Sequence, residues 1–219
     1  KVNTDKELAI NVTMGYPLSH TPICSYIKTL LQLQTKGRTN HHTWSLANAI
    51  QALKHPYTTE LSDGESTRLI KHLTENNIYY PTDSYFSENE FIKTIFTYHK
   101  NTGDLLTYIS EVTKEIGKKY KNNESKKFET QTGNDSPQRQ LYAESIYIVH
   151  TIANRLKTIH ESGIMPVKPE TISRLFNQIM ASKNIPLHGE PLSGIQIMGI
   201  LETRNLDFKN VLLLSANEG

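Results

Sequence analysis

The chain has 219 residues, of which 37% are hydrophobic and 21% are charged, an ordinary composition for a globular protein with a substantial core. No apolar run approaches the length of a membrane-spanning helix, so the composition excludes a membrane protein. The formal net charge of +2 hints at an anionic partner but lies far below that of a dedicated nucleic-acid module. The single cysteine, Cys24, has no partner for an internal disulfide, and we therefore predict a cytoplasmic location.

The first segment predicts a strand followed by a helix. Residues 8–14, LAINVTM, are apolar and rich in branched side chains, and the run Gly15-Tyr16-Pro17 breaks this strand. Thr21 and Pro22 then have the residue types of an N-cap and a first helical position. The helix that follows is expected to end at Gly37 and to bury one face, formed by Ile23, Ile27, Leu30 and Leu31.

The middle of the chain predicts a bundle of helices. Residues 44–53 have Trp44 and later apolar residues at helical spacing, and the pattern ends at His55-Pro56-Tyr57. Ser62 or Asp63 is expected to cap a helix that runs through Leu73. Further helices are expected after a capping box formed by Ser87 and Glu90, and from Asp104 onward.

Residues 121–136 are almost without apolar side chains, and they predict a flexible linker because such a segment buries too little surface to offset the entropy of ordering. Ser136-Pro137 then opens a long helix with a near-continuous apolar stripe, which ends at Gly163. A last helix is expected around residues 172–180.

The final segment, residues 194–219, predicts two strands. Residues 195–200 and 211–214 are continuous apolar runs, and a polar connection separates them. Runs without alternation are typical of parallel strands that are buried on both faces. We expect residues 8–14 and 195–200 to pair as adjacent strands, with Val12 beside Ile197.

Two stretches resemble a known family. Residues 199–208, GILETRNLDF, resemble motif V of UvrD-like superfamily 1 helicases, in which a basic residue precedes a Leu-Glu-Phe end, and they are closer still to the AddB/RexB-like subunits of bacterial helicase-nucleases that contain a PD-(D/E)XK nuclease. Residues 10–22, INVTMGYPLSHTP, resemble the motif IV region of the same family. Gly199, Leu201 and Asn205 depart from the pattern of active helicases, which implies a copy without motor function.

The resemblance implies an α/β fold that is mostly α. Residues 1–38 and 190–219 would form part of a second RecA-like domain with a parallel sheet built from both chain ends. Residues 39–189, including the linker at 121–136, would form a helical insertion at the position of the 2B domain. We expect the chain to be a piece of a longer protein.

The resemblance also implies a function. The parent would be an ATP-dependent helicase and exonuclease of double-strand break repair, with ATP and Mg²⁺ used by the full complex and none held here. This piece would channel single-stranded DNA and dock a partner helicase-nuclease subunit. Thr203 and Arg204 would contact DNA or a neighbouring domain, and Asp207 would face the nucleotide cleft. The alternative is a helical protein-interaction scaffold that makes no contact with DNA.

The residues themselves offer weaker signals. Lys118 and Lys119 belong to a lysine cluster that either contacts phosphates or forms a solvated helix end. Tyr79, Tyr80 and Tyr85 either stack on unpaired bases or pack in the interior. We predict no catalytic or metal site, because the acid-x-Lys triplets at 124–126 and 207–209 have no upstream Pro-Asp, and no Gly-Lys-Ser or Gly-Lys-Thr occurs to hold ATP.

Overall fold

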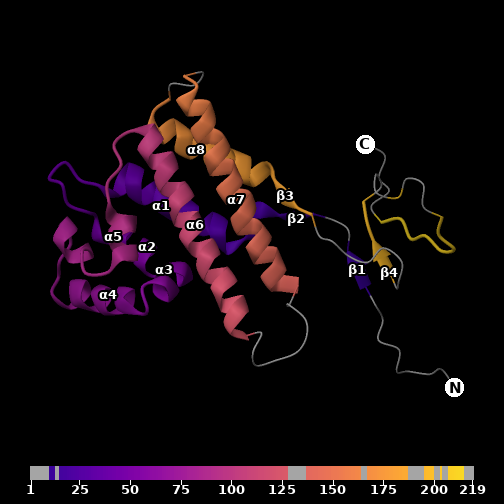
Figure 1. Cartoon of the computed structure of the whole chain (residues 1–219), viewed down its shortest axis with the longest axis horizontal. Helices are drawn as coiled ribbons and strands as arrows, with labels where there is room; N and C mark the ends of the chain where they lie inside the picture. Colours follow the sequence, from indigo (N-terminus) through magenta and orange to yellow (C-terminus); the bar gives the residue numbers. More distant parts are fainter. Residues whose placement is uncertain are drawn as a thin grey trace. The chain divides into compact units, whose positions relative to one another are not determined.

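The computed structural model describes residues 10–12, 15–127, 137–163, 167–186, 195–199, 203 and 207–214. The described chain is mostly helical (Figure 1). Its α-helices are α1 (Pro22–Gln32), α2 (Leu46–Leu53), α3 (Pro56–Leu61), α4 (Glu65–Glu75), α5 (Glu90–Phe96), α6 (Thr102–Lys127), α7 (Pro137–Glu161) and α8 (Pro169–Ser182). The shorter helical segments are η1 (Leu18–His20), the π-helical η2 (Leu33–Gly37) and η3 (Asp83–Phe86). The strands are β1 (Ile10–Val12), β2 (Tyr16–Pro17), β3 (Asn184–Ile185) and β4 (Ile195–Ile197).

The chain divides into two compact units. The end unit consists of Lys1–Tyr16 and Pro186–Gly219, and the helical unit consists of Pro17–Ile185. From the sequence we expected the corresponding boundaries after residues 38 and 189. Helix α1, which we expected in the sheet domain, is therefore part of the helical unit.

In the end unit, strands from the two ends of the chain lie side by side. β1 pairs with β4 in parallel, with Ile10 opposite Ile195, Asn11 opposite Gln196 and Val12 opposite Ile197. The predicted pairing of Val12 with Ile197 is confirmed. Within the described residues this sheet has only two strands, so a RecA-like sheet is not part of the described structure.

Two expectations for the end unit are wrong. The strand predicted at residues 211–214 has no ladder partner, and its four side chains are between 61% and 85% exposed. Ile195 and Ile197 of β4 are about half exposed and are not buried on both faces. A strand becomes stable only when neighbouring strands satisfy its backbone groups and cover its side chains, and an apolar composition supplies neither.

The helical unit has a dense core around α1. Tyr26, Ile27 and Leu30 of α1 are fully buried, as are Tyr108 of α6 and Phe176 of α8. The start of α1 matches the prediction, with Thr21 as its N-cap and Pro22 at the first position. Where the chain enters and leaves this unit, β2 and β3 form a small antiparallel two-stranded sheet. Next to this sheet, the Leu18 N–H donates to the Lys183 carbonyl oxygen at 2.9 Å.

Trp44 is not part of the helix in which we expected it, because α2 begins at Leu46. Trp44 is extended and makes an isolated bridge with Arg38. Its buried ring lies 4.8 Å from the Arg38 guanidinium carbon, and its indole N–H donates to Asp83 at 2.7 Å. Arg38 also donates two hydrogen bonds to the Asp83 carboxylate, and these bonds hold the pKa of Asp83 below its usual value. These contacts join the segment before α2 to η3.

Two predicted helix caps differ from those observed. Helix α4 has Gly64, whose φ of 84° favours glycine, at its N-cap position, while the side-chain oxygen of the predicted Ser62 accepts the Ser66 N–H of the first turn at 3.2 Å. Helix α5 is capped by Asn89, whose side-chain oxygen accepts from the Phe91 and Ile92 N–H groups, instead of by a box of Ser87 and Glu90. In both helices the N-cap position is the residue directly before the first helical residue, and the spacing of residue types in the sequence does not show where that residue lies.

Helix α6 is longer than the sequence predicted. It continues to Lys127, so the first seven residues of the expected linker at 121–136 are helical, and the remainder lies outside the described residues. Extending a helix adds one hydrogen bond for each residue fixed, once the costly nucleus exists. A polar segment joined to a well-packed helix can therefore remain helical without burying surface of its own.

Candidate functional site

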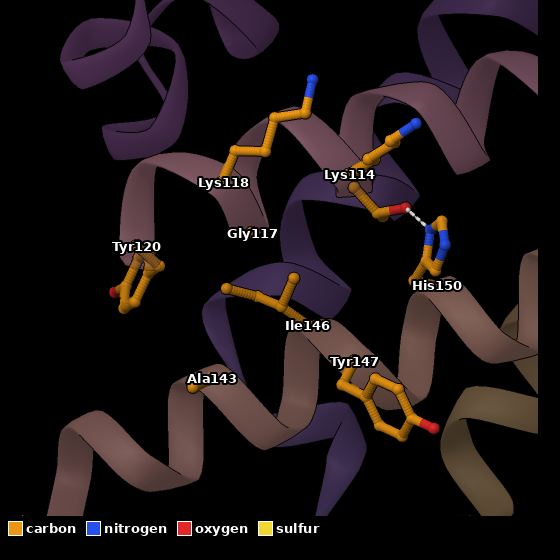
Figure 2. A pocket seen from close by; sticks show the side chains of 9 residues that line it. Lys114, Gly117, Lys118, Tyr120, Ala143, Ile146, Tyr147 and His150 are labelled. Carbon is orange, nitrogen blue, oxygen red and sulfur yellow. Dashed lines mark hydrogen bonds between the residues drawn. The ribbon is translucent and has the colours of Figure 1, made fainter. Parts of the chain in front are cut away.

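The predicted residue Lys118 lines a groove between α6 and α7 (Figure 2). The groove has a volume of about 290 Å³. The lining residues are Thr113, Lys114, Gly117, Lys118, Tyr120, Ala143, Ile146, Tyr147 and His150. This surface combines the methylene chains of two lysines, two tyrosine rings and an apolar floor.

Small residues open the floor of the groove. Gly117 and Ala143 face it from opposite helices, and the buried Ile146 side chain lies between them (Figure 2). A Cβ added at Gly117 would meet only the Ile146 Cγ2 atom, at 3.7 Å, which is an ordinary contact. Glycine inside a helix costs about 1 kcal/mol relative to alanine. Helix packing therefore does not require this glycine, and its effect is to keep the groove open.

The two lysines form one edge of the groove. Figure 2 shows the ammonium groups of Lys114 and Lys118 directed away from α7, so that only their methylene chains line the groove. Lys118 forms an ion pair with Glu115 of the same helix at 2.6 Å and is about half exposed. Lys114 has no ion pair among the described residues. Both groups are accessible to an anion that lies along the groove.

Lys119, the other lysine predicted to contact DNA, does not line the groove. Its ammonium donates to the Glu60 carbonyl oxygen and lies 3.4 Å from an Asp63 carboxylate oxygen. The side chain is 31% exposed and joins α6 to the turn between α3 and α4. Lys119 therefore has a structural contact that Lys118 lacks.

A polar network forms one end of the groove. The Ser110 hydroxyl donates to the Asn154 side-chain oxygen at 2.7 Å, which leaves the Asn154 amide to donate to His150 Nε2 at 2.9 Å. His150 Nδ1 then has the proton, and it lies 3.0 Å from the Thr113 hydroxyl, the bond drawn as a dashed line in Figure 2. The same nitrogen lies 3.2 Å from the Ser110 carbonyl oxygen. Every ring nitrogen has a partner, so His150 holds the two helices in register.

Tyr120 and Tyr147 add aromatic surface to the groove. Burial raises the pKa of Tyr120 further above its ordinary value, and its phenol is neutral at physiological pH. Tyr147 is 64% exposed and lies on the outer side of α7. The rings can stack on bases or pack against apolar groups. Neither tyrosine was predicted from the sequence, because their positions relative to Lys118, at i+2 and on a second helix, give no pattern within one segment.

The residues predicted to contact DNA or nucleotide in the end unit are described only in part. Thr203 is half-buried, Asp207 is exposed, and Arg204 lies outside the described residues. Asp207 and Lys209 of one acid-x-Lys triplet are exposed, and the side chains of the other triplet lie outside the described residues. No group of three metal-ligating side chains occurs in the part of the chain that the structure describes.

One serine–histidine contact has the geometry of a catalytic pair but not its chemistry. Ser25 Oγ lies 3.1 Å from His55 Nε2, while His55 Nδ1 accepts the Tyr57 N–H at the start of α3. The proton is therefore on Nε2, which has no lone pair to accept a proton from Ser25. Burial lowers the pKa of His55 to about 4, and the ring is a neutral helix cap.

The other tyrosines from the sequence analysis are on the surface. Tyr79 and Tyr80 are more than 60% exposed, so interior packing is excluded for both rings. Tyr85 is 36% exposed, and the centre of its ring lies 6.1 Å from the centre of the His72 ring. The Tyr79 carbonyl oxygen accepts the Leu46 N–H at 3.0 Å, which fixes the backbone that presents these rings.

The helices in the described residues are all too short or too polar to cross a membrane. No family model, curated protein or solved structure matches this chain.

Proposed function

We propose that this chain is a non-catalytic, DNA-channelling part of a bacterial ATP-dependent helicase and exonuclease of the AddB/RexB-like kind, acting in double-strand break repair. The parallel β1–β4 pair supports this proposal most directly. β1 lies within the segment that resembles motif IV, and β4 directly precedes the segment that resembles motif V; the two strands pair although more than 180 residues separate Val12 from Ile197. Pro17–Ile185 is then an excursion between neighbouring strands, as expected of an insertion in a RecA-like domain.

The proposal assigns the following parts. β1 and β4 would be two strands of a larger RecA-like sheet, and the cytoplasmic parent complex would use ATP and Mg²⁺. Thr203 and Arg204 would contact DNA, and Asp207 would face the nucleotide cleft. A partner helicase-nuclease subunit would complete the machine.

The α6–α7 groove supports a contact with single-stranded DNA. Lys114 and Lys118 are spaced by one helical turn and place two positive charges along the α6 edge of the groove, where phosphates can reach them from solvent. Tyr120 and Tyr147 offer aromatic faces on which unpaired bases can stack without regard to sequence. A duplex would bury neither the rings nor the apolar floor, so the groove favours a single strand.

A salt titration of DNA binding tests this proposal. The 219-residue chain is titrated with a labelled oligothymidine at several salt concentrations, beside a Lys114→Glu/Lys118→Glu variant. For two lost phosphate contacts, the slope of log K against log salt should fall in magnitude by about 1.4. The matched control is Lys71→Glu, since Lys71 is an exposed lysine in an i,i+4 pair on α4. Equal slopes for the double variant and the unmodified chain would remove the groove from the DNA path.

The second candidate is a protein-interaction scaffold that makes no contact with DNA. Two features favour a protein partner. Residues 211–214 are apolar and exposed, and a second groove beside α7 has an apolar floor. This candidate requires that the chain show no binding to oligothymidine even at low salt, whereas the first requires affinity that falls steeply as salt is added.

A further inference from the structure

A second groove lies on the flank of α7 that faces away from α6. In Figure 1, α6 follows one side of α7, while the end of α8 and strand β3 emerge on the other side. The groove between α7, α8 and β3 has a volume of about 440 Å³. Its lining residues are Tyr147, Ile148, Thr151, Ile152, Arg155, Leu156, Ile159, Ile179, Lys183 and Asn184.

The floor of this α7–α8 groove is an apolar stripe along one helix. Ile148, Ile152, Leu156 and Ile159 are spaced by four, four and three residues, so they lie on one face of α7. Ile152 and Leu156 are buried, while Ile148 and Ile159 of α7 and Ile179 of α8 are only half-buried. The stripe therefore has unfilled apolar surface along its length.

The margin of the groove is positively charged. Arg155 and Lys183 are both exposed, neither forms an ion pair among the described residues, and no acidic side chain lines the groove. Two glutamates of α7 do not line the groove. Glu161 forms an ion pair with Lys157 at 3.9 Å, and Glu144 lies one turn before Ile148. An occupant with carboxylates beside its apolar face would complement this margin.

We propose that the α7–α8 groove docks an acidic amphipathic helix of a partner protein. The stretch from Tyr147 to Ile159 rises by about 1.5 Å per residue, or roughly 18 Å in all, which matches a partner helix of about twelve residues. Apolar residues of that helix at i, i+4, i+7 and i+11 fill the spaces between the isoleucines, and Glu or Asp side chains pair with Arg155 and Lys183. Tyr147 lies at one end of the groove, and exposed tyrosine and arginine side chains are favoured anchors of interfaces.

Two other occupants fit less well. A second copy of this chain docked symmetrically would bring Arg155 and Lys183 close to the same residues of its partner, and like charges oppose each other there. A nucleic-acid strand would neutralise the two cations but would leave the isoleucine floor uncovered. An acidic amphipathic helix satisfies both the floor and the margin.

The test uses the full chain and a synthetic peptide. A labelled fourteen-residue peptide with Leu at i, i+4, i+7 and i+11 and Glu elsewhere is titrated by fluorescence anisotropy, with a scrambled peptide of equal composition as control. We expect binding in the micromolar range, as for a small groove with two charge pairs. Arg155→Glu should weaken binding about tenfold or more, while Lys114→Glu, in the α6–α7 groove, should leave it unchanged.

A second variant reports on the site itself. Tyr147→Trp places an indole at the end of the groove, and its emission should shift on addition of the peptide but not of the scrambled control. Because Arg155 and Tyr147 are exposed, both variants should keep the circular dichroism spectrum of the unmodified chain.

Several outcomes would overturn the proposal. These are equal binding of the peptide to the Arg155→Glu variant, equal binding of the scrambled peptide, no binding at millimolar peptide, or a concentration-dependent dimer that Arg155→Glu dissociates. Displacement of the peptide by oligothymidine from the Lys114→Glu/Lys118→Glu variant would also overturn it, because this groove would then itself bind nucleic acid. The double variant is used because Tyr147 lines both grooves. The salt titration of oligothymidine is measured on the same preparation, so the failure of either proposal is seen separately.

Discussion

The helical unit and the end unit use apolar residues in opposite ways. In the helical unit most of the aliphatic side chains of the core, together with the rings of Trp44, Tyr26 and Phe176, are fully buried. In the end unit the described apolar residues at 195, 197, 208 and 211–214 are all at least 39% exposed. The two units therefore differ in how much apolar surface their own residues can cover.

The difference follows from where each element finds its hydrogen bonds. A helix satisfies its backbone internally, so helices from one continuous segment can pack and complete a core. A strand depends on neighbours for its backbone and for both of its faces. The described part of the end unit supplies one three-residue pair, and its apolar side chains have too few elements against which to pack.

Alanine substitutions of one apolar residue in each unit should have very different effects on the free energy of unfolding, and this is the largest difference that we predict. Trp44→Ala removes a buried ring together with the Phe96 edge contact, the Arg38 stacking and the Asp83 hydrogen bond, and it should lower the free energy of unfolding by about 3–5 kcal/mol. Leu212→Ala removes a side chain that is 85% exposed and should change it by less than about 0.5 kcal/mol. Urea denaturation followed by circular dichroism measures both values. Similar losses for the two variants would mean that residues 211–214 are covered in solution.

The same contrast explains what the sequence could predict. The helices from α1 to α8 have apolar residues at helical spacing, and periodicity located most of them to within a few residues. Trp44 fits the α2 pattern but is held outside the helix by Arg38 and Asp83, and no local pattern contains a contact to a residue 39 positions away. The run at 211–214 has the composition of a strand, but composition does not show whether a neighbour exists.

The candidate site was predictable only in part. Lys118 was found from a cluster of charges, yet the same cluster contains Lys119, which the structure assigns to the α3–α4 turn. The groove depends on Gly117 facing Ala143 and Ile146, and this juxtaposition arises from the packing of α6 on α7. A glycine inside a helical pattern was the one signal in the sequence that could have pointed to it.

Acid should weaken the helical unit through His55. Its pKa of about 4 lies below the ordinary value of 6.5, so between these pH values the unfolded chain binds a proton that the folded chain does not. The stabilisation is complete above pH 6.5 and is lost as the pH falls to about 4, by about 1–2 kcal/mol after allowance for partial exposure. His55→Asn keeps a side chain that can cap α3 but does not titrate.

The measurement is the free energy of unfolding of both proteins from pH 7 to pH 4. The variant should be less stable at pH 7, because it loses the ring contacts with Tyr26 and Tyr57, and its stability should fall less steeply with acid. His99, whose pKa is lowered mainly by burial, is present in both proteins, so the difference between the curves belongs to His55. Parallel curves would show that His55 is not the source of the acid sensitivity.

Gly117→Ala should separate stability from function within the helical unit. The new methyl group meets Ile146 at an ordinary distance, and replacement of a glycine inside a helix should stabilise the chain by about 0.5–1 kcal/mol. The same methyl group occupies the floor of the α6–α7 groove, so the affinity for oligothymidine should fall severalfold at constant salt. Because the charges are unchanged, the slope of log K against log salt should stay the same, unlike that of the lysine variant. A more stable protein with unaltered DNA affinity would show that the groove floor contacts no base, and the glycine would then remain without a physical account.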